Sequence, residues 1–154
     1  MEGKSLHYGI NNIKKIASYL NTPEVLGIKD INEESIRIGK GFQFSFDKDT
    51  GIFIIKAVLD FVCRIDTPEP LKLFGAKIQY DFLFKDFEDI VKERENSKID
   101  LPDDLVITLM SVSYSTSRGI LSMLSFGTEY QNIILPLVDI QEFKKMIHPD
   151  AEIK

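Results

Sequence analysis

The side chains that could carry out chemistry are few and scattered along this sequence of 154 residues. The two histidines, His7 and His148, stand near opposite ends of the chain, and neither is accompanied by an acid or a nucleophile at a spacing typical of a catalytic set. Cys63, the only cysteine, lies in an apolar alternating segment, where burial would leave the thiol inert. We therefore interpret both histidines as surface residues and expect no nucleophilic catalysis.

Other reactive groups give the same result. Many serines fall in one segment, but none lies within the Gly-x-Ser-x-Gly pattern of a hydrolase nucleophile. No carboxylate pair stands in an apolar setting, and no metal-ligand spacing occurs. Gly39-Lys40-Gly41 lacks the rest of a phosphate-binding loop and no helix follows it, so we interpret it as a bulge or bend in a strand. We expect a protein that is not an enzyme and that has no cofactor and no metal site.

The composition indicates an ordinary globular domain, with 44% apolar and 28% charged residues. The net charge of -5 disfavours nucleic acid as a partner. No apolar run approaches the length of a membrane span, and the N-terminus has no signal-peptide core. A single cysteine is typical of a reducing compartment. We expect one cytoplasmic domain over residues 1–154, without insertion into a membrane.

Three segments alternate between apolar and polar residues, at 35–47, 52–65 and 74–84, and turn residues separate them. This pattern predicts three antiparallel strands joined as a meander. The second strand is apolar on both sides. Its outward side carries Ile52, Ile54, Val58 and Val62. Such a surface requires at least partial cover.

Helical spacing predicts three helices around this sheet. Residues 10–20 repeat apolar or small side chains at Ile10, Ile13, Ala17 and Leu20. Residues 103–128 form one long helix, with Gly127 as a left-handed stop. A last short helix covers 140–147, capped by Asp139. The fold class is therefore α+β, with helices on one face of an antiparallel sheet.

The long helix carries two apolar stripes on a helical wheel, which together exceed the arc of about 100° that one sheet needs to cover. One stripe contains Leu105, Leu109, Val112, Thr116, Ile120 and Met123. The second contains Val106, Met110, Ser113, Ser117, Leu121 and Leu124. The small serines would let another backbone come close. We predict that the second stripe is an oligomer interface, with a loop or the C-terminal segment of the same chain as the alternative cover.

Three features in the second half of the chain resemble the SecB family of export chaperones and SecB-like proteins. They are the Ser117-Arg118-Gly119 motif, the apolar segment 135–139 with its Leu-Pro and Asp139, and Phe143. In that family an antiparallel sheet precedes a long helix with Ser-Arg-Gly near its end, then an extended crossover and a closing helix. The predicted N-terminal helix, in place of a strand, and a longer interval before the crossover depart from classical members.

The resemblance implies a homotetramer, built as a dimer of dimers, that holds unfolded polypeptides in apolar grooves without ATP. On matching positions, the client-binding residues would be Ile133, Ile134, Leu135, Leu137, Val138 and Phe143. Alternation alone adds the outward residues of the second strand, for which cover by the N-terminal helix is an equal alternative. The tail that engages the SecA motor is not recognisable before Lys154, so SecA is a weaker expectation than unfolded polypeptides.

Two other functions stay open at this stage. The first is a carrier in which the helix and a curved sheet enclose an apolar cavity for a small ligand. The second is a chaperone that serves a toxin–antitoxin system instead of export. The apolar surface left over once a core is assigned favours a polypeptide-binding protein over both an enzyme and a carrier.

Overall fold

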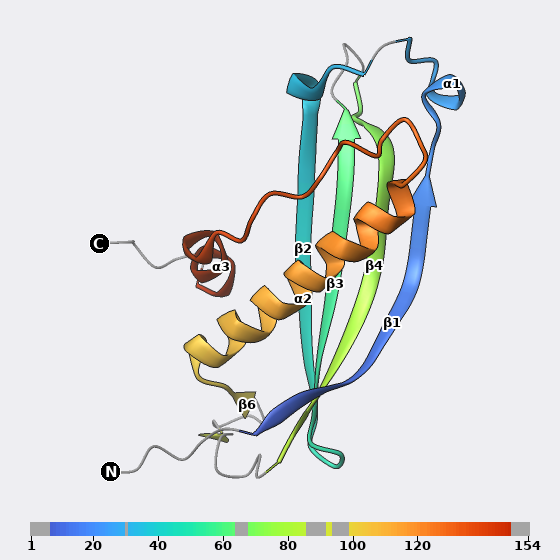
Figure 1. Cartoon of the computed structure of the whole chain (residues 1–154). Helices are drawn as coiled ribbons and strands as arrows, with labels where there is room; N and C mark the ends of the chain where they lie inside the picture. The colour runs from blue at the N-terminus through green and yellow to red at the C-terminus, as the bar shows by residue number, and fades with distance from the viewer. Residues whose placement is uncertain (1–6, 30, 64–67, 86–91, 94–98, 149–154) are drawn as a thin grey trace.

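The computed structural model describes residues 7–29, 31–63, 68–85, 92–93 and 99–148. Its main sheet has four antiparallel strands in the order β1-β4-β3-β2, with the two longer helices on one side (Figure 1). The strands of this sheet are β1 (Tyr8–Leu20), β2 (Ile36–Asp47), β3 (Ile52–Cys63) and β4 (Leu71–Phe84). A separate pair comprises β5 (Lys92–Glu93) and β6 (Ile99–Asp100). The helices are α1 (Pro23–Leu26), the 3₁₀ turn η1 (Glu33–Ser35), α2 (Asp103–Ser125) and α3 (Ile140–Ile147). The predicted α+β class with an antiparallel sheet is confirmed.

The meander of β2, β3 and β4 follows the predicted alternation. Along β3, every second residue from Phe53 to Cys63 is buried on the side of the sheet that faces α2. Gly51, with φ of 68°, closes the turn between β2 and β3 in a conformation that favours glycine. The register of β2 against β3 is continuous through residues 39–41, so the bulge, one of the two interpretations offered for this segment, is wrong. A bulge would have inserted one residue into β2, and all later side chains of β2 would then point to the opposite side of the sheet. Residues 64 and 65, which we assigned to this strand, lie outside the described residues.

The segment predicted as an N-terminal helix is the edge strand β1. It pairs antiparallel with β4, and the register shifts at Asn11 and again at Ile16. Each shift adds one residue to β1 relative to β4. Residues that face α2 are therefore three positions apart across each bulge, as Ile10 and Ile13 are. This spacing imitates the i, i+3 repeat of a helix and explains why the prediction was wrong.

Helix α2 crosses the sheet diagonally, from the side of β2 toward β4 and β1 (Figure 1). The serine-containing stripe faces the sheet of its own chain: the Oγ of Ser117 lies 2.6 Å from the hydroxyl oxygen of Tyr80 in β4. The predicted subunit interface is therefore wrong for the buried members of this stripe, which pack inside their own chain, where the small Ser113 and Ser117 let α2 approach the sheet. The fully or nearly fully buried members are Met110, Ser113, Ser117 and Leu121. Val106 and Leu124 are partly buried and pack against the same core.

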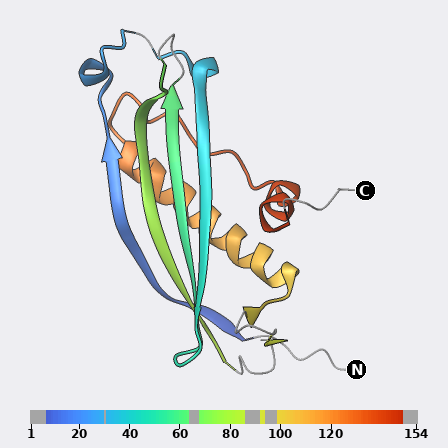
Figure 2. The ribbon, with the colours of Figure 1, turned by 180° about the vertical axis from the view of Figure 1, so that it is seen from behind.

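The other face of the sheet is open in the view from behind (Figure 2), where no helix of the described chain covers it. The outward residues of β3 lie there, half-buried among their neighbours on adjacent strands. Since residues 8–20 form a strand, the proposed cover by an N-terminal helix is wrong. On this face the Tyr19 hydroxyl donates to Asp60 Oδ1 at 2.7 Å, across Gly75.

The segment that follows α2 is fixed to the rest of the fold at its start. The helix ends at Ser125, and Gly127 has the left-handed conformation that we predicted, with φ of 77°. Tyr130 is fully buried, stacks on Phe74 at a ring-centroid distance of 5.4 Å and donates its hydroxyl to the carbonyl of Asn21. Among the described residues, no helix combines the length and the hydropathy needed to cross a membrane.

Candidate functional site: the strap and the closing helix

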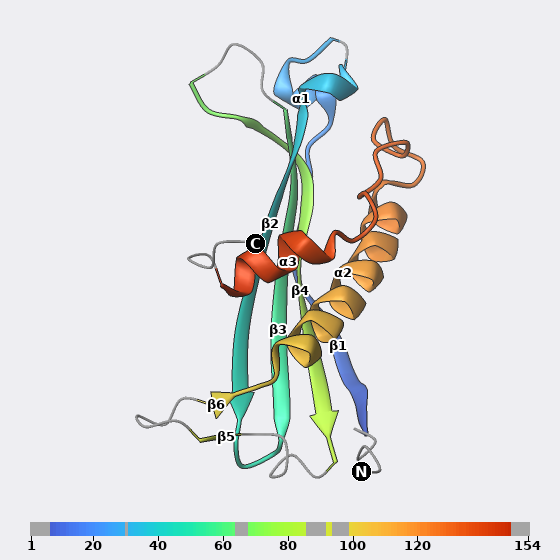
Figure 3. The same ribbon diagram turned by 90° about the vertical axis from the view of Figure 1, so that its left-hand side faces the viewer.

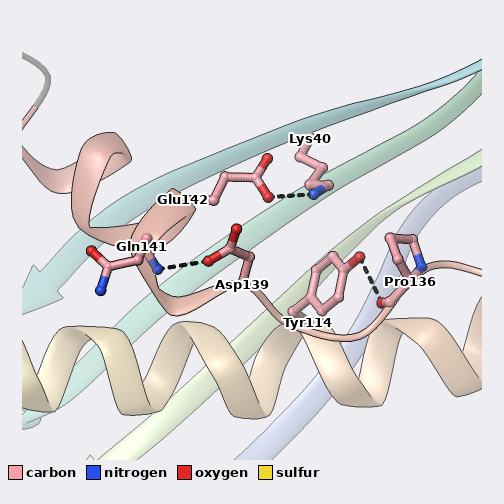
Figure 4. Close-up of polar contacts among 6 residues, drawn as sticks. All are labelled: Lys40, Tyr114, Pro136, Asp139, Gln141 and Glu142. Carbon is pink, nitrogen blue, oxygen red and sulfur yellow. Dashed lines mark hydrogen bonds and ion pairs between the residues drawn. The ribbon is translucent and has the colours of Figure 1, made fainter.

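The candidate site is formed by the extended segment 133–139, here called the strap, and by α3, which lies on the same side of the sheet as α2 (Figure 3). Asp139 begins α3 as predicted, because its carboxylate accepts a hydrogen bond from the backbone N–H of Gln141 at 2.9 Å (Figure 4). Phe143 then inserts between Phe42 of β2 and Tyr114 of α2. The ring centroids are 5.5 and 5.8 Å away, and both contacts are edge-to-face. This aromatic contact anchors α3.

An ion pair beside Phe143 joins α3 to the sheet. The Nζ of Lys40 lies 2.7 Å from Oε2 of Glu142, and it also lies 5.5 Å from the centre of the Tyr114 ring (Figure 4). Lys40 points toward the helices because it is paired with Leu59, a core residue of β3. Its side chain is only 14% exposed, so Glu142 balances a charge that would otherwise be costly at this position. This contact is absent from the sequence prediction, although strict alternation places Lys40 on the same side as Ile38 and Phe42.

Within the described chain the strap is not paired with a strand, and side chains of α2 donate hydrogen bonds to two of its carbonyl groups. The Arg118 Nε donates to the carbonyl of Leu135 at 2.8 Å. The Tyr114 hydroxyl donates to the carbonyl of Pro136 at 3.1 Å, as Figure 4 shows. Pro136 has no N–H that would need a partner. The Arg118 of the Ser-Arg-Gly motif therefore positions the backbone of the strap.

Fixing the backbone in this way divides the side chains of the strap between the core and the surface. Leu135 is 2% exposed and belongs to the core, whereas Leu137 is 77% and Ile134 is 54% exposed. Two residues of α3 add to the exposed apolar surface, Ile140 at 51% and Met146 at 37%. We refer to Ile134, Leu137, Ile140 and Met146 as the strap surface.

A hollow of about 210 Å³ lies at the start of the strap, next to the beginning of β2. Its apolar lining comes from Ile36, Ile38, Phe61, Ile133 and Ile134, and Glu33 and Asn132 form its polar part. The hollow could accept one aliphatic or aromatic side chain. It joins the exposed Ile134 to the core of the sheet.

The predicted client-binding residues do not form one surface. Leu135 and Phe143 are buried and hold the fold together, so their assignment to an open groove is wrong for this conformation. Ile133 and Val138 are partly buried against the core, while Ile134 and Leu137 are exposed. The outward residues of β3 lie on the opposite face of the sheet, because they alternate with the core residues that face α2. The sheet therefore separates the two predicted groups.

Both His148 and Cys63 contact a polar side chain elsewhere in the described chain. His148 Nε2 lies 2.8 Å from Asp103 Oδ2, and both side chains are exposed. The Sγ of Cys63 is buried, 3.2 Å from the Oγ of Ser35. Within the described residues, no group of three or more His, Cys, Asp and Glu side chains could hold a metal ion.

Burial raises the pKa of four tyrosine hydroxyls above the ordinary value. The four are Tyr19, Tyr80, Tyr114 and Tyr130. For Tyr19 the hydrogen bond to Asp60 acts in the same direction, whereas for Tyr80 the bond with Ser117 partly opposes the effect of burial. These hydroxyls serve as neutral hydrogen-bond partners inside the fold.

The strap and α3 thus provide exposed apolar side chains on a backbone held by polar contacts, an arrangement suited to binding. No model of a known protein family matches this chain, and no curated protein matches it.

Proposed function

We propose that this protein is a cytoplasmic, ATP-independent chaperone of the holdase type, which binds non-native polypeptides through apolar surface. The observation that carries the proposal is the strap surface, where Leu137 and Ile134 are 77% and 54% exposed although the backbone beneath them is fixed. Apolar side chains gathered in this way are typical of a binding site. An extended client would cover them with its own apolar side chains and would need little sequence specificity.

The resemblance to the SecB family adds weight to this proposal. The strand β1 at the start of the fold removes one of the departures from the family that the sequence suggested. Arg118, from the motif that carries the resemblance, holds the segment that the family would use as its crossover. The proposal includes self-association into a homotetramer, with a molar mass by light scattering near four chains. Export and the service of a toxin–antitoxin system are alternative settings for the same activity.

A carrier for a small apolar ligand is less well supported. Such a carrier needs space between the helix and the sheet. At the centre of this interface, Ser117 and Tyr80 are in hydrogen-bond contact and Met110 is fully buried. A ligand could enter there only if α2 moved away from the sheet.

The test is suppression of aggregation of a urea-unfolded reporter enzyme, diluted into buffer without nucleotide. The wild-type chain should suppress light scattering, and the double variant Ile134→Ser with Leu137→Ser should need about tenfold more protein for the same effect. A fully buried aliphatic side chain contributes about 1.5–3 kcal/mol, and about 1.4 kcal/mol corresponds to a factor of ten. Retention of full activity by this double variant would show that the strap surface does not bind clients.

The matched control is Val25→Ser in α1. Val25 is 77% exposed, as Leu137 is, but it lies outside the strap and α3. This variant should protect the reporter as well as the wild type does. Equal losses in Val25→Ser and in the strap variant would indicate general exposed hydrophobicity instead of a defined site, and absence of protection by the wild type would refute the proposed function.

A further inference from the structure

Helix α3 is held to the rest of the fold by few side chains. Of its eight residues, Phe143 alone is buried, and Glu142 and Ile147 are partly buried. The other side chains of the helix are exposed. At its C-terminal end, His148 contacts Asp103, but both side chains are more than half exposed, so that water weakens this contact. The attachment of α3 therefore depends mainly on Phe143 and Glu142.

The segment that connects α3 to the strap is held loosely. The carbonyls of Leu135 and Pro136 accept hydrogen bonds from α2. In the described part of the chain, the next two residues, Leu137 and Val138, make no hydrogen bond. Rotation of the backbone at these two residues can carry α3 away from the sheet and leave the contacts of α2 with the strap intact.

Phe143 fills a site that is lined by aromatic rings. Its ring lies edge-to-face against Phe42 of β2 and Tyr114 of α2, at centroid distances of 5.5 and 5.8 Å. We call the space between these two rings the aromatic site. Figure 3 shows α3 in front, beside β2, which is an edge strand of the sheet. Phe42 is only half-buried even with α3 in place, so an outside side chain can reach this site when α3 leaves.

A lysine lies beneath α3 at the border of the aromatic site. The Nζ of Lys40 is 2.7 Å from the Glu142 carboxylate and 5.5 Å from the centre of the Tyr114 ring. The two charged side chains are unequally covered, since that of Lys40 is 14% exposed and that of Glu142 is 40% exposed. Closure of α3 thus removes more water from the ammonium than from the carboxylate. Loss of this water opposes closure, and the ion pair offsets it.

The unequal cover predicts opposite effects for the two charges. Without the Glu142 carboxylate, the Lys40 charge lies unpaired beneath α3, and departure of α3 returns water to it. Without the Lys40 charge, Glu142 can turn to water, and an apolar side chain at position 40 extends the contact with Tyr114. An ion pair whose only role was to hold α3 would weaken the attachment in both cases. Lys40 therefore opposes closure of α3, and Glu142 favours it.

We propose that α3 is an autoinhibitory lid, in which Phe143 occupies a binding site for an apolar side chain of a non-native polypeptide and the Lys40–Glu142 pair keeps the lid ready to open. A polypeptide that binds only the open form shifts the population toward that form. Opening adds the aromatic site to the apolar surface that the strap already exposes. The identity of the ligand rests on the proposed chaperone function, whereas the opening of α3 is measured separately from it.

Hydrogen–deuterium exchange of the α3 amides measures the opening, because a helix of eight residues does not persist alone in water. In the wild type, these amides should exchange faster than those at the centre of α2. Glu142→Gln should raise the exchange rates in α3 about tenfold, and Lys40→Met should lower them about tenfold. In the Lys40→Met background, Glu142→Gln should change the rates by less than about twofold.

The matched control is Lys144→Gln, which removes a charge from an exposed residue of the same helix. It should leave the exchange rates within about twofold of the wild type. Slower exchange in Glu142→Gln, or faster exchange in Lys40→Met, would overturn the proposal, because the pair would then have no opposed charges. Equal protection of α3 and the centre of α2 in the wild type would also overturn it. Circular dichroism confirms that each variant is folded.

The aggregation assay tests whether the lid covers the binding site. The apparent dissociation constant is inversely proportional to the open fraction. Glu142→Gln should therefore need about tenfold less protein than the wild type for the same suppression, and Lys40→Met about tenfold more. Absence of protection by the wild type would refute the proposed function, and the exchange rates would still decide whether α3 opens. Protection by the wild type that neither variant changed would overturn the autoinhibitory role of α3.

Discussion

The substitution Ser117→Leu tests whether the serine-containing stripe of α2 belongs to the core of one chain or to a contact between chains. Ser117 is fully buried, and its hydroxyl lies 2.6 Å from that of Tyr80. Leucine is larger and has no hydroxyl. The substitution therefore forces extra volume between helix and sheet, and it leaves the Tyr80 hydroxyl without its partner.

The expected loss of stability has two parts. Overpacking a filled interface costs about 1–3 kcal/mol. A buried hydroxyl left unpaired costs about 1–3 kcal/mol more. The free energy of unfolding should therefore fall by about 2–6 kcal/mol, and with a urea dependence of about 2 kcal/mol per molar the midpoint should move down by about 1–3 M. Urea titration followed by circular dichroism measures this shift.

Three further variants separate these parts. Ser117→Ala removes only the hydrogen bond and should cost about 1–3 kcal/mol. Tyr80→Phe should cost less, about 0.5–1.5 kcal/mol, because the Ser117 hydroxyl can turn to a carbonyl of the preceding helical turn. Ser115→Leu is the matched control, since Ser115 is exposed on the same helix and its change should stay within about 0.5 kcal/mol. Equal urea midpoints for Ser117→Leu and Ser115→Leu, with a change of molar mass for Ser117→Leu alone, would refute the assignment to the core.

Three other predictions follow from close packing and burial. A Cβ on Gly75 would lie 2.5 Å from the carbonyl oxygen of Leu59, so Gly75→Ala should lower the free energy of unfolding in urea by about 1–3 kcal/mol. A Cβ on Gly9 would have no other atom within 4 Å, so Gly9→Ala should change the free energy of unfolding by less than about 0.5 kcal/mol. Equal losses for Gly75→Ala and Gly9→Ala would contradict the role of close packing at Gly75. Phe143→Ala should cost about 3 kcal/mol and speed amide exchange in α3, whereas Met146→Ala on the exposed side of α3 should leave this exchange slow. Burial raises the pKa of the hydroxyl groups of the four tyrosines. As the pH rises, the unfolded chain therefore loses these hydroxyl protons before the folded chain does. The free energy of unfolding should therefore keep its full value below a pH of about 10 and fall above it. Tyrosinate absorbance that rose at a lower pH than the pH of unfolding would contradict this.

The elements with regular periodicity could be predicted from the sequence. Strict alternation identifies β2, β3 and β4, and the cap residue Asp139 fixes the start of α3. β1 could not be predicted in this way. Its two bulges, at Asn11 and Ile16, change the spacing of the apolar residues from two to three, and a local pattern cannot distinguish this spacing from a helical repeat. Only the pairing with β4, about sixty residues away along the chain, resolves the ambiguity.

The predicted binding residues were limited by the same dependence on long-range contacts. The sequence shows that α2 has two apolar stripes, but not which of them faces the sheet. The Ser117–Tyr80 contact decides this, and it joins residues that are 37 positions apart. Similarly, the apolar residues of the strap look equivalent in the sequence, and the contacts of Arg118 and Tyr114 with its carbonyls determine that Leu135 points inward and Leu137 outward. The strap surface therefore depends on side chains outside the strap.

Strand β1 raises the question of how an edge strand with exposed apolar side chains avoids pairing with other sheets. An edge of this kind is a predicted aggregation site unless some feature blocks it. β1 has two such features, the bulges that interrupt its regular pairing and Lys15, which points toward the helices among Ile10 and Ile13. A second sheet that added to this edge would bury the Lys15 charge without a partner, which is strongly unfavourable. Lys15→Val removes this charge and should therefore increase aggregation of the chain with itself, which light scattering measures.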